Sequence, residues 1–279
     1  MMDKRYLLCT DLDRTLVPNG KQPCSPDALG RLKNLVSRIE MTLVFVTGRH
    51  KDLIQQAILE YDLPKPDYAI SDVGSTIYRI ESDQWNQMEI WDEHIASDWA
   101  GNSHTSLHHL LSTLQELELQ EPAKQNRHKL SYYVSMNADS EALISKMEVL
   151  LTQKNIKANL IWSIDEQANV GLLDVLPARA NKLHAIEFLM KNQGYMLENT
   201  VFSGDSGNDL DVLKSGIHSV LVANAAEDVK EDAAAGSDQN TLYIAKGGYL
   251  GMNGNYSAGI LEGLAHYLPE VDQWIRNTN

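Results

Sequence analysis

Short apolar runs and helical stretches alternate along the first third of the chain. Strand-like apolar runs occupy 6–9, 41–46 and 67–71, and each one ends in polar or small residues. Between them, apolar residues from 29 to 39 recur at helical spacing, and a second helical stretch covers about 50–60. Uninterrupted apolar runs of this length are typical of strands buried in a parallel sheet. The alternation predicts an α/β fold with a doubly wound, Rossmann-like parallel sheet.

The middle of the chain follows a different pattern. After residue 81, three tryptophans stand among polar residues, and leucines from 107 to 117 recur at helical spacing. The stretch 129–134 alternates between polar and apolar residues, and a helical stretch (140–152) and another strand (158–162) follow it. Alternation favours a strand with one exposed face. This rhythm predicts an inserted α+β domain with an antiparallel sheet.

The parallel pattern returns in the last third of the chain. The expected elements are strands at 171–177, 200–203, 219–222 and 241–244, the last at a sheet edge, and helices near 182–192, 226–235 and 260–268. The core sheet is therefore predicted to be built from both ends of the chain. We assign 1–83 and 174–279 to this core and 84–173 to the inserted domain, whose size suits an independent unit.

The composition fits a globular protein and argues against several partners. Of 279 residues, 43% are hydrophobic and 22% charged, and 24 basic against 38 acidic residues give a net charge of −14. Nucleic acids and anionic membranes are bound through basic patches, so we expect neither as a partner. No apolar run is long enough for a signal peptide or a membrane helix. Two cysteines, Cys9 and Cys24, make no disulfide framework, and a cytoplasmic location is expected.

Two aspartates, Asp11 and Asp13, follow the first apolar run. In open α/β sheets, the chemistry takes place just beyond the carboxyl ends of the strands. Two carboxylates at such a place raise each other's pKa unless a cation holds them. This suits a Mg²⁺ site with one nucleophilic oxygen and one proton carrier. The alternative for such a pair taken alone is a solvated, aspartate-rich turn.

Polar residues also follow two other predicted strands. Thr47 and Gly48 follow the second strand, and Asp205 and Asp209 follow the strand near residue 200. Because parallel strands end at one edge of the sheet, we expect these residues to converge on the first acidic pair. A hydroxyl and an open backbone N–H suit phosphate oxygens, although Thr47 also fits a helix N-cap. Asp205 and Asp209 have two possible roles. They could simply belong to a tight turn, or they could add carboxylate ligands to a metal site, in which case the site would suit Mg²⁺ better than Zn²⁺.

A phosphoryl group also needs positive charge on its non-bridging oxygens. Lys182 opens a predicted helix after a strand and is the best-placed candidate, and Arg49 and Arg179 flank the same edge. Each of these side chains taken alone is more often exposed to solvent. Their occurrence in this order, together with the acids, favours a phosphoryl-transfer site.

Together these residues resemble the four motifs of the haloacid-dehalogenase superfamily of phosphatases. The matching stretches are Asp11-Leu-Asp13-Arg-Thr15, Val46-Thr47-Gly48-Arg49, Lys182 and Gly204-Asp205-Ser206-Gly207-Asn208-Asp209. The insertion between the second and third motifs resembles the class IIB (type C2B) cap of that superfamily. Within it, the chain is most similar to the sucrose-phosphate phosphatases. The supporting stretches are Lys129-Leu-Ser-Tyr-Tyr, Asp174-Val-Leu-Pro-Ala-Arg179-Ala-Asn181-Lys182 and Tyr256-Ser-Ala-Gly-Ile-Leu-Glu-Gly-Leu-Ala-His266-Tyr.

The resemblance implies a role for each motif residue. Asp11 would be the nucleophile that forms an aspartyl-phosphate, and Asp13 would be the acid and base for the leaving oxygen and the hydrolytic water. Mg²⁺ would be held by the Asp11 carboxylate, the Asp13 backbone carbonyl and Asp205, with Asp209 close by. The implied phosphate-binding residues are Thr47, Gly48 and Lys182.

The inserted domain is expected to select the substrate, because a closing cap recognises the sugar and excludes water from the reaction. For the sugar the resemblance suggests Lys129, Arg179, Asn181 and Asn208, and we count Arg49 among the expected substrate-binding residues as well.

Some residues in and around the motifs call for a separate interpretation. Arg14 stands where the family more often has Asn or Gly, and Thr76 where sucrose phosphatases usually have Glu. We expect both to bear on the leaving sugar and neither to touch the predicted chemistry. The three tryptophans are interpreted as packing anchors in preference to sugar platforms. His104 and His108 have the spacing of a metal pair, but a solvated helix face is favoured.

We therefore expect a Mg²⁺-dependent phosphomonoesterase that acts on a phosphorylated disaccharide or similar glycoside, with sucrose 6-phosphate first. This substrate would place the enzyme in sucrose biosynthesis. Other substrates of the same cap class stay open, namely mannosylfructose-phosphate, glucosylglycerol-phosphate and hexose phosphates. A non-catalytic sugar-phosphate-binding or synthase-partner module has no need for all five of Asp11, Asp13, Lys182, Asp205 and Asp209, and is disfavoured. A transient contact with a sugar-phosphate synthase also stays open.

Overall fold

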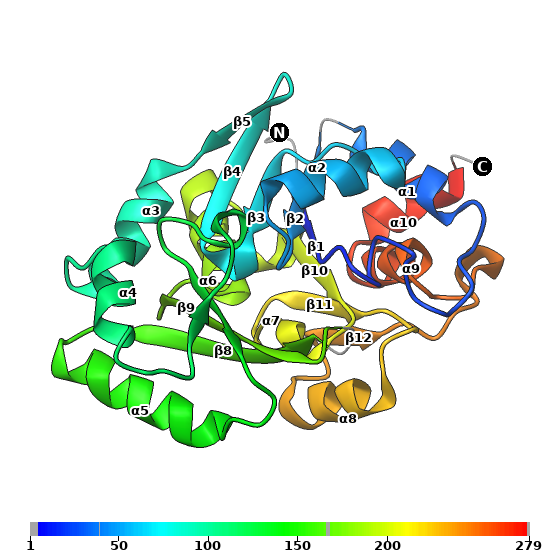
Figure 1. The fold of residues 1–279 in the computed structure, drawn as a ribbon. Helices are drawn as coiled ribbons and strands as arrows, with labels where there is room; N and C mark the ends of the chain where they lie inside the picture. The colour runs from blue at the N-terminus through cyan, green and yellow to red at the C-terminus, as the bar shows by residue number, and fades with distance from the viewer. Residues whose placement is uncertain (1–4, 39, 166–167, 278–279) are drawn as a thin grey trace.

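The computed structural model describes residues 5–38, 40–165 and 168–277, which contain two β-sheets (Figure 1). The larger sheet has eight strands in the order β12-β11-β10-β1-β2-β3-β4-β5. From β12 to β3 the neighbours are parallel, whereas β3, β4 and β5 pair antiparallel. The strands are β1 (Tyr6–Thr10), β2 (Met41–Val46), β3 (Tyr68–Ser71), β4 (Thr76–Glu81), β5 (Gln84–Gln87), β10 (Thr200–Gly204), β11 (His218–Leu221) and β12 (Leu242–Ile244). The predicted α/β sheet is confirmed.

Strand β1 lies where the order of strands in the chain reverses. Thr10 pairs with Phe45 of β2 on one side and with Ser203 of β10 on the other. The chain therefore runs outward through β2 and β3 in one direction and through β11 and β12 in the other. In open α/β sheets, ligands bind at such a switch point, beyond the carboxyl ends of the strands. The ends of β1, β2 and β10 lie level there, which brings the predicted motifs together.

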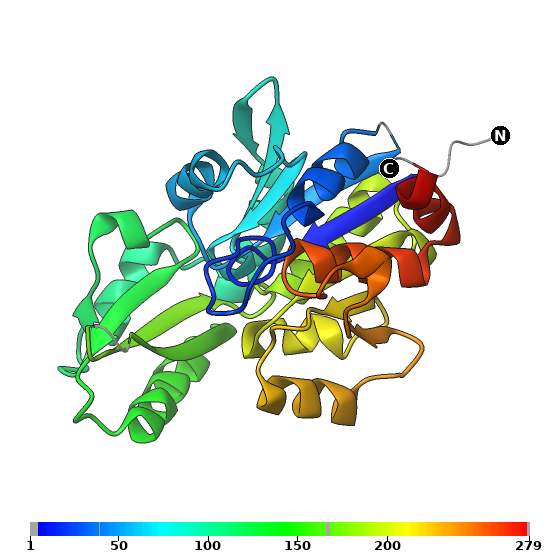
Figure 2. The ribbon, with the colours of Figure 1, turned by 90° about the vertical axis from the view of Figure 1, so that its right-hand side faces the viewer.

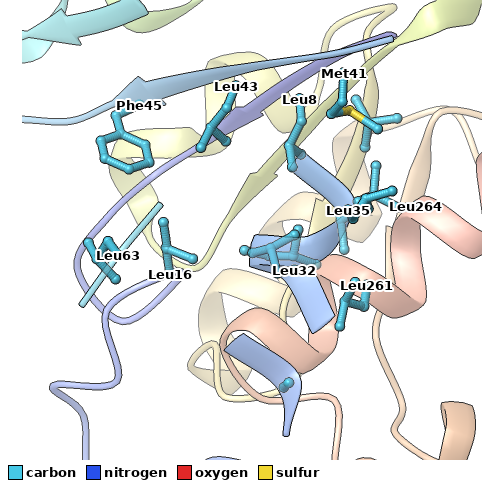
Figure 3. Packing of buried hydrophobic residues seen from close by; sticks show 14 of the residues in the cluster. Leu8, Leu16, Leu32, Leu35, Met41, Leu43, Phe45, Leu63, Leu261 and Leu264 are labelled. Atoms are coloured by element: carbon cyan, nitrogen blue, oxygen red, sulfur yellow. The ribbon is translucent and has the colours of Figure 1, made fainter. Parts of the chain in front are cut away.

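Helices cover both faces of the larger sheet. The first face carries α1 (Ala28–Val36), α2 (Lys51–Glu60), α9 (Ser257–Tyr267) and α10 (Pro269–Asn277). Figure 3 shows part of this layer, where Leu32 and Leu35 of α1 and Leu261 and Leu264 of α9 pack beneath Leu8 and the strands around it. The opposite face carries α3 (Glu89–Ala96), α6 (Lys182–Gln193), α7 (Leu210–Leu213) and α8 (Glu227–Gly236).

The smaller sheet lies beside the larger one, as both ribbon views show (Figures 1 and 2, green). Its four strands are antiparallel in the order β6-β7-β9-β8. They are β6 (Glu118–Leu119), β7 (Leu130–Val134), β8 (Ala158–Asp165) and β9 (Val170–Pro177), and α4 (His104–Leu111) and α5 (Ser140–Gln153) belong to the same unit. The unit has its own core, which includes Trp99, Tyr132 and Met147. This is the antiparallel α+β unit that the sequence predicts.

Short 3₁₀ turns connect several of these elements. They are η1 (Asp72–Gly74), η2 (Ser97–Trp99), η3 (Pro122–Lys124), η4 (Leu197–Asn199), η5 (Gly207–Asp209) and η6 (Tyr249–Gly251). Within the described parts of the chain, every helix is too short or too polar to cross a bilayer.

One strand was assigned to the wrong sheet. The run 171–177 was expected to be a parallel strand of the core, but it forms β9, between β7 and β8 of the smaller sheet. Leu173 and Val175 pack in the core of the smaller unit, and Leu176 packs in the cluster of the larger sheet. Because this strand is buried against two cores, it has the uninterrupted apolar pattern of a parallel strand.

The hairpin of β4 and β5 is a second difference from the expectation. Residues 84–87 were expected in the inserted domain, yet β5 pairs with β4 at the edge of the larger sheet. Trp85 lies on this strand and packs partly against the larger core. Trp91 and Trp99 are fully buried, in the larger and smaller cores respectively, which confirms them as packing anchors.

Candidate active site

Three buried carboxylates meet beyond the ends of β1 and β10. Asp11 follows β1, Asp205 follows β10, and Asp209 ends the short turn η5. One oxygen atom of each carboxylate lies within 4.8 Å of the other two. Over the described residues, this is the single group of three or more histidine, cysteine or acidic side chains with such spacing. The predicted convergence of these acids is therefore observed.

Asp209 is held by the backbone of its own turn. Its Oδ2 accepts the N–H groups of Asp205 and Ser206, each at 3.1 Å. A Cβ atom at Gly204 would lie only 2.5 Å from the same oxygen, so a glycine is required for the carboxylate to fold back onto the turn. The local sequence thus fixes Asp209 with its second oxygen directed at the site.

Lys182 neutralises part of this negative charge. Its Nζ donates to Asp11 Oδ1 at 2.9 Å and to Asp209 Oδ1 at 2.7 Å, and only 5% of its surface is exposed. Asn181 caps the helix that Lys182 begins. A Cβ atom at Gly74 would lie 2.5 Å from the Asn181 backbone, so this glycine allows η1 to pack against the helix start. The alternative of a solvent-exposed lysine is thereby excluded.

Burial dominates the protonation of the acids. It raises the pKa of Asp11 to about 7, although Lys182 acts in the opposite direction. It also raises the pKa of Asp205 to about 6, with the negative charge of Asp209 adding to the effect. Burial alone would lower the pKa of Lys182, but Asp11 and Asp209 outweigh it, and the pKa is raised. The cluster therefore carries more negative charge than the lysine alone compensates.

The oxygen atoms of the cluster fit a hard divalent cation. Oδ2 of Asp205 is buried and accepts no hydrogen bond from any described residue. The other oxygen of this carboxylate accepts the Thr15 hydroxyl at 3.2 Å. An all-oxygen, carboxylate-rich donor set is preferred by Mg²⁺ and disfavoured by Zn²⁺. Asp11, Asp205 and Asp209 are thus suited to a magnesium ion.

Arg14 lies closer to this site than the sequence indicated. Its Nε is 3.3 Å from Asp205 Oδ2. The expectation that Arg14 leaves the predicted chemistry untouched is therefore wrong. The backbone of Arg14 is left-handed there, with φ of 58°, which the sequence did not predict.

Asp13 is not part of the group of three carboxylates and pairs with Arg49. The guanidinium donates from Nε to Asp13 Oδ2 at 2.8 Å and from Nη2 to Oδ1 at 2.6 Å, and Asn19 Nδ2 donates to Oδ1 at 2.7 Å. Burial acts to raise the pKa of Asp13, but these donors more than offset it and hold the pKa below its usual value. Arg49, assigned to the substrate, has an internal partner here, and its contact with a substrate stays a prediction.

Thr47 and Gly48 lie at the end of β2, which pairs directly with β1. Thr47 is buried, and its hydroxyl accepts the N–H of Arg49 at 3.2 Å. Gly48 is exposed. Their position beside Asp11 is the one that phosphate binding requires, and that role stays a prediction.

Lys129 joins the smaller unit to the larger sheet. It is buried, and its Nζ lies 3.6 Å from Asp72 Oδ1, in the turn after β3, and 3.7 Å from Asp174 Oδ2, in β9. Its ammonium makes no hydrogen bond to a side chain or carbonyl within the described residues. Both distances exceed that of a normal hydrogen bond, which leaves the donors of Lys129 available.

The other residues assigned to the sugar have different surroundings. Arg179 donates from its side chain to the buried carboxylate of Asp98 at 2.8–3.1 Å and to the Ser97 hydroxyl. Asn181 accepts a backbone N–H as a helix cap, and Asn208 is exposed in η5. Arg179 and Asn181 thus have structural partners, and sugar binding by any of the three stays a prediction.

The two histidines with metal-like spacing each contact the smaller unit. His104 lies 3.3 Å from Gln125 Oε1, and His108 lies 3.2 Å from the Tyr132 hydroxyl. They belong to no metal-like group within the described residues.

With this geometry established, we compared the chain with known proteins. The family model for sucrose-6F-phosphate phosphohydrolase matches residues 4–268. The chain belongs to this family. A protein of Nitrosococcus oceani, described only as a HAD-like hydrolase, is 52% identical over 98% of this chain and 75% of its own length.

Two further relatives of this chain have names that state a substrate. Sucrose-phosphatase 1 of Nicotiana tabacum is 27% identical over 94% of this chain, which spans 59% of the tobacco protein. Mannosylfructose-phosphate phosphatase of Agrobacterium fabrum is also 27% identical, over 94% of this chain and 96% of its own length.

Solved structures agree with this assignment. The sucrose-phosphatase of Synechocystis in complex with sucrose and phosphate has 26% identity and a TM-score of 0.73, over 95% of this chain and 98% of that one. A haloacid dehalogenase-like hydrolase of Bacillus subtilis, with 18% identity and a TM-score of 0.66, shares the fold. The chain is a phosphatase of the haloacid-dehalogenase superfamily and most resembles the sucrose-phosphatases.

Several contacts of the site involve residues that the sequence did not single out. Thr15 donates to Asp205, Asn19 donates to Asp13, and Asp72 and Asp174 flank Lys129. Thr15 and Asp174 belong to stretches that resemble the family motifs, so the sequence could have indicated both residues. Asp72 directly follows β3, so its place at a strand end was the available signal, whereas Asn19 lies in a loop, where spacing along the chain gives none.

Proposed function

We propose that the enzyme is a Mg²⁺-dependent phosphomonoesterase that hydrolyses a phosphorylated disaccharide, with sucrose 6-phosphate as its preferred substrate. The observation that carries this proposal is the buried cluster of Asp11, Asp205 and Asp209 with Lys182 bonded between two of the acids. Membership in the sucrose-6F-phosphate phosphohydrolase family supports the substrate class.

In the proposed reaction, an oxygen of Asp11 attacks phosphorus and the bond from phosphorus to the sugar oxygen breaks. Asp13 protonates the departing sugar oxygen. It then takes a proton from the water that attacks the aspartyl-phosphate, which releases phosphate and restores Asp11. Lys182 donates to Asp11 Oδ1 at 2.9 Å, so we assign the attack on phosphorus to Oδ2.

The ion pair of Asp13 with Arg49 has a consequence for this scheme. The hydrogen bonds from Arg49 and Asn19 lower the pKa of Asp13 and so favour its ionised form. We infer that Asp13 exchanges Arg49 for the leaving oxygen when substrate binds, and that the freed guanidinium then meets the phosphoryl oxygens beside Thr47 and Gly48. The dianionic phosphoryl group favours this exchange because it attracts Arg49 and raises the proton affinity of Asp13.

Asp11 and Asp205, with Asp209 close by and the Asp13 carbonyl, would hold the magnesium ion. The ion supplies positive charge that offsets the charge developing on the phosphoryl oxygens. The close spacing of the three carboxylates and the buried Asp205 Oδ2 without a hydrogen-bond donor among the described residues support this assignment.

We place the substrate-recognition cap at about residues 88–177, from the end of β5 to the end of β9, because sheet membership changes there. Lys129, between Asp72 and Asp174, is the residue of this cap that we assign to the sugar hydroxyls. The aligned length of the Agrobacterium mannosylfructose-phosphate phosphatase favours mannosylfructose-phosphate as the second candidate. A role in sucrose biosynthesis, contact with a synthase and a cytoplasmic location stay predictions.

Phosphate release from a panel of substrates tests this proposal. The panel contains sucrose 6-phosphate, mannosylfructose-phosphate, glucosylglycerol-phosphate and glucose 6-phosphate, each with Mg²⁺ and with EDTA. We expect the highest kcat/KM on sucrose 6-phosphate and background rates with EDTA. Equal kcat/KM on glucose 6-phosphate would reject the disaccharide, and full activity in EDTA would reject the magnesium ion.

A further inference from the structure

The turn that carries Asp13 has an unusual backbone. Arg14, the next residue, has a φ of 58°, a left-handed conformation that is unfavourable for a residue with a Cβ atom. The Leu12 carbonyl accepts the N–H groups of Thr15, Leu16 and Val17 at 3.2, 3.0 and 2.7 Å, which closes the turn from inside. A conformation of this kind persists only where further contacts hold it.

Two asparagine side chains hold the backbone of Arg14 from opposite sides. Its N–H donates to Asn19 Oδ1 at 2.8 Å, and its carbonyl accepts Asn224 Nδ2 at 2.7 Å. Asn19 is exposed and belongs to the same loop. Asn224 is only 4% exposed and comes from the turn after β11, 210 positions away in the sequence. Asn224 is therefore the contact that ties the turn to the sheet.

The amide of Asn224 is itself fixed in orientation. Its Oδ1 accepts the backbone N–H of Tyr256 at 2.8 Å, at the start of α9. Because the Arg14 carbonyl can only accept and the Tyr256 N–H can only donate, the two ends of the amide are not interchangeable. The side chain thus links β11, α9 and the turn after β1 in a single orientation.

The far end of the same loop has separate anchors. Asn253 Nδ2 donates to the Pro23 carbonyl at 2.8 Å, and the Tyr256 hydroxyl donates to the Gln22 carbonyl at 3.0 Å. These bonds hold residues 22–23, well along the chain from Asp13. The structure therefore offers a second asparagine as a control, at the far end of the same loop and exposed, where Asn255 Nδ2 also donates to the Pro23 carbonyl.

We propose that Asn224 is a positioning residue of the phosphatase site, whose amide fixes the Arg14 carbonyl and thereby places Asp13 and the Arg14 guanidinium relative to Asp11 and Asp205. The inference rests on the proposed acid and base role of Asp13. A misplacement of about 1 Å in a reacting group can lower a rate on the order of 100-fold, while substrate contacts elsewhere are kept. Loss of Asn224 should therefore lower kcat and leave KM nearly unchanged.

The test compares Asn224→Asp, Asn224→Ala and the control Asn253→Ala. Asn224→Asp keeps an oxygen that can accept the Tyr256 N–H, removes the donor to Arg14 and adds a negative charge, whereas Asn224→Ala removes both hydrogen bonds and adds no charge. We expect kcat to fall at least about tenfold in both Asn224 variants, with KM changed less than about threefold. The control should stay within about twofold of wild type in kcat, because its bond lies at the far end of the loop.

Amide hydrogen exchange provides a readout that does not depend on activity. Both Asn224 variants should speed exchange at residues 14–17 at a temperature where circular dichroism shows them folded, and Asn253→Ala should not. A folded Asn224→Asp with kcat within twofold of wild type, or with unchanged exchange at residues 14–17, would overturn the inference. If the wild type releases no phosphate from any substrate, the proposed function fails, while the exchange comparison still decides whether Asn224 holds the turn.

Discussion

At the scale of single residues, burial determines the charge of the site. The pKa of Asp11 is raised to about 7 and that of Asp205 to about 6, whereas free aspartate titrates near 4. Between about pH 4 and 7 these two carboxyls therefore bind more protons in the folded protein than in the unfolded chain. The contribution of these groups to the free energy of unfolding consequently falls as pH rises through this window and is lowest above about pH 7.

The first prediction concerns magnesium and pH. A bound cation must displace the protons from Asp11 and Asp205, so its affinity should rise with pH until both carboxyls are ionised. We expect a given Mg²⁺ concentration to raise Tm more at about pH 8 than at about pH 5, as measured by differential scanning fluorimetry. Asp205→Asn, which removes one charged ligand, should reduce the stabilisation at pH 8. An equal or larger stabilisation at pH 5 would contradict the prediction.

The second prediction concerns Asp11. Asp11→Asn keeps the size of the side chain and an oxygen that can accept from Lys182, but the amide is a poor nucleophile. We expect phosphate release to fall to background while the far-ultraviolet circular dichroism spectrum is retained. Substantial Mg²⁺-dependent turnover by this variant would rule out Asp11 as the nucleophile.

The third prediction concerns Lys182. Lys182→Met keeps most of the side-chain volume and leaves the buried carboxylates of Asp11 and Asp209 without their cation. We expect the free energy of unfolding in EDTA at about pH 8 to fall by about 3 kcal/mol, as measured in urea. Added Mg²⁺ should recover part of the loss. Lys146→Met, in an exposed pair with Glu116, is the control and should change nothing measurable. Equal behaviour of the two variants would refute the prediction.

At the scale of elements, the sequence predicts strands well and sheet membership less well. Strand β1 and its acidic tip follow from local pattern, because burial on both faces leaves an apolar run that ends in polar residues. Strand β9 has the same kind of run for another reason, since Leu176 meets the larger core and Val175 the smaller one. The hydrophobic pattern of a strand shows that the strand is buried, but it does not show which sheet or helix it packs against.

The two linkers between the sheets are clamped together by one ion pair. Arg179 lies between β9 and α6, and Asp98 lies in η2 after α3. The carboxylate of Asp98 accepts both the backbone N–H of Arg179, at 2.9 Å, and its guanidinium. Because both crossings of the chain meet here, this pair is placed to set the angle between cap and sheet.

The fourth prediction tests this clamp. Arg179→Ala should lower the free energy of unfolding by about 2 kcal/mol, because the buried Asp98 loses most of its donors while the guanidinium was partly solvated. Urea unfolding monitored by tryptophan fluorescence measures it, since Trp99 lies next to Asp98. In the control Arg276→Ala, the lost partner is Asp272 at the surface, and no measurable change is expected. A loss no larger than that of the control would show that the pair does not hold the linkers.

At the scale of the whole molecule, the residues of the candidate active site were largely predictable and their surroundings were not. Asp11, Lys182, Asp205 and Asp209 converge because parallel strands end at one edge, a rule that needs only strand order. The ion pair of Arg49 with Asp13, by contrast, depends on the side-chain conformation of Arg49, which brings together two loops far apart in the sequence. Ion pairs of long side chains are fixed by tertiary distances that no spacing along the chain encodes.

The last prediction concerns the junction between cap and sheet. Lys129 comes from the smaller unit, and its ammonium lies near Asp72, in the turn after β3 of the larger sheet, and Asp174 of β9, beyond hydrogen-bond distance from both. Strands β1, β2 and β3 are neighbours, so Asp72 lies about two strand spacings, or roughly 10 Å, from the tip of β1. That distance is on the scale of the sugar part of a disaccharide phosphate whose phosphorus is at Asp11.

Lys129→Met should therefore separate the sugar from the chemistry. We expect kcat/KM for sucrose 6-phosphate to fall at least about tenfold, because a sugar hydroxyl loses a charged donor in a buried site. The rate on p-nitrophenyl phosphate, which has no sugar, should stay within about twofold of wild type. Lys154→Met, on the exposed end of the cap helix α5, should change neither rate. A parallel loss on both substrates would assign Lys129 to cap stability, since a specificity contact can affect only the substrate that makes it.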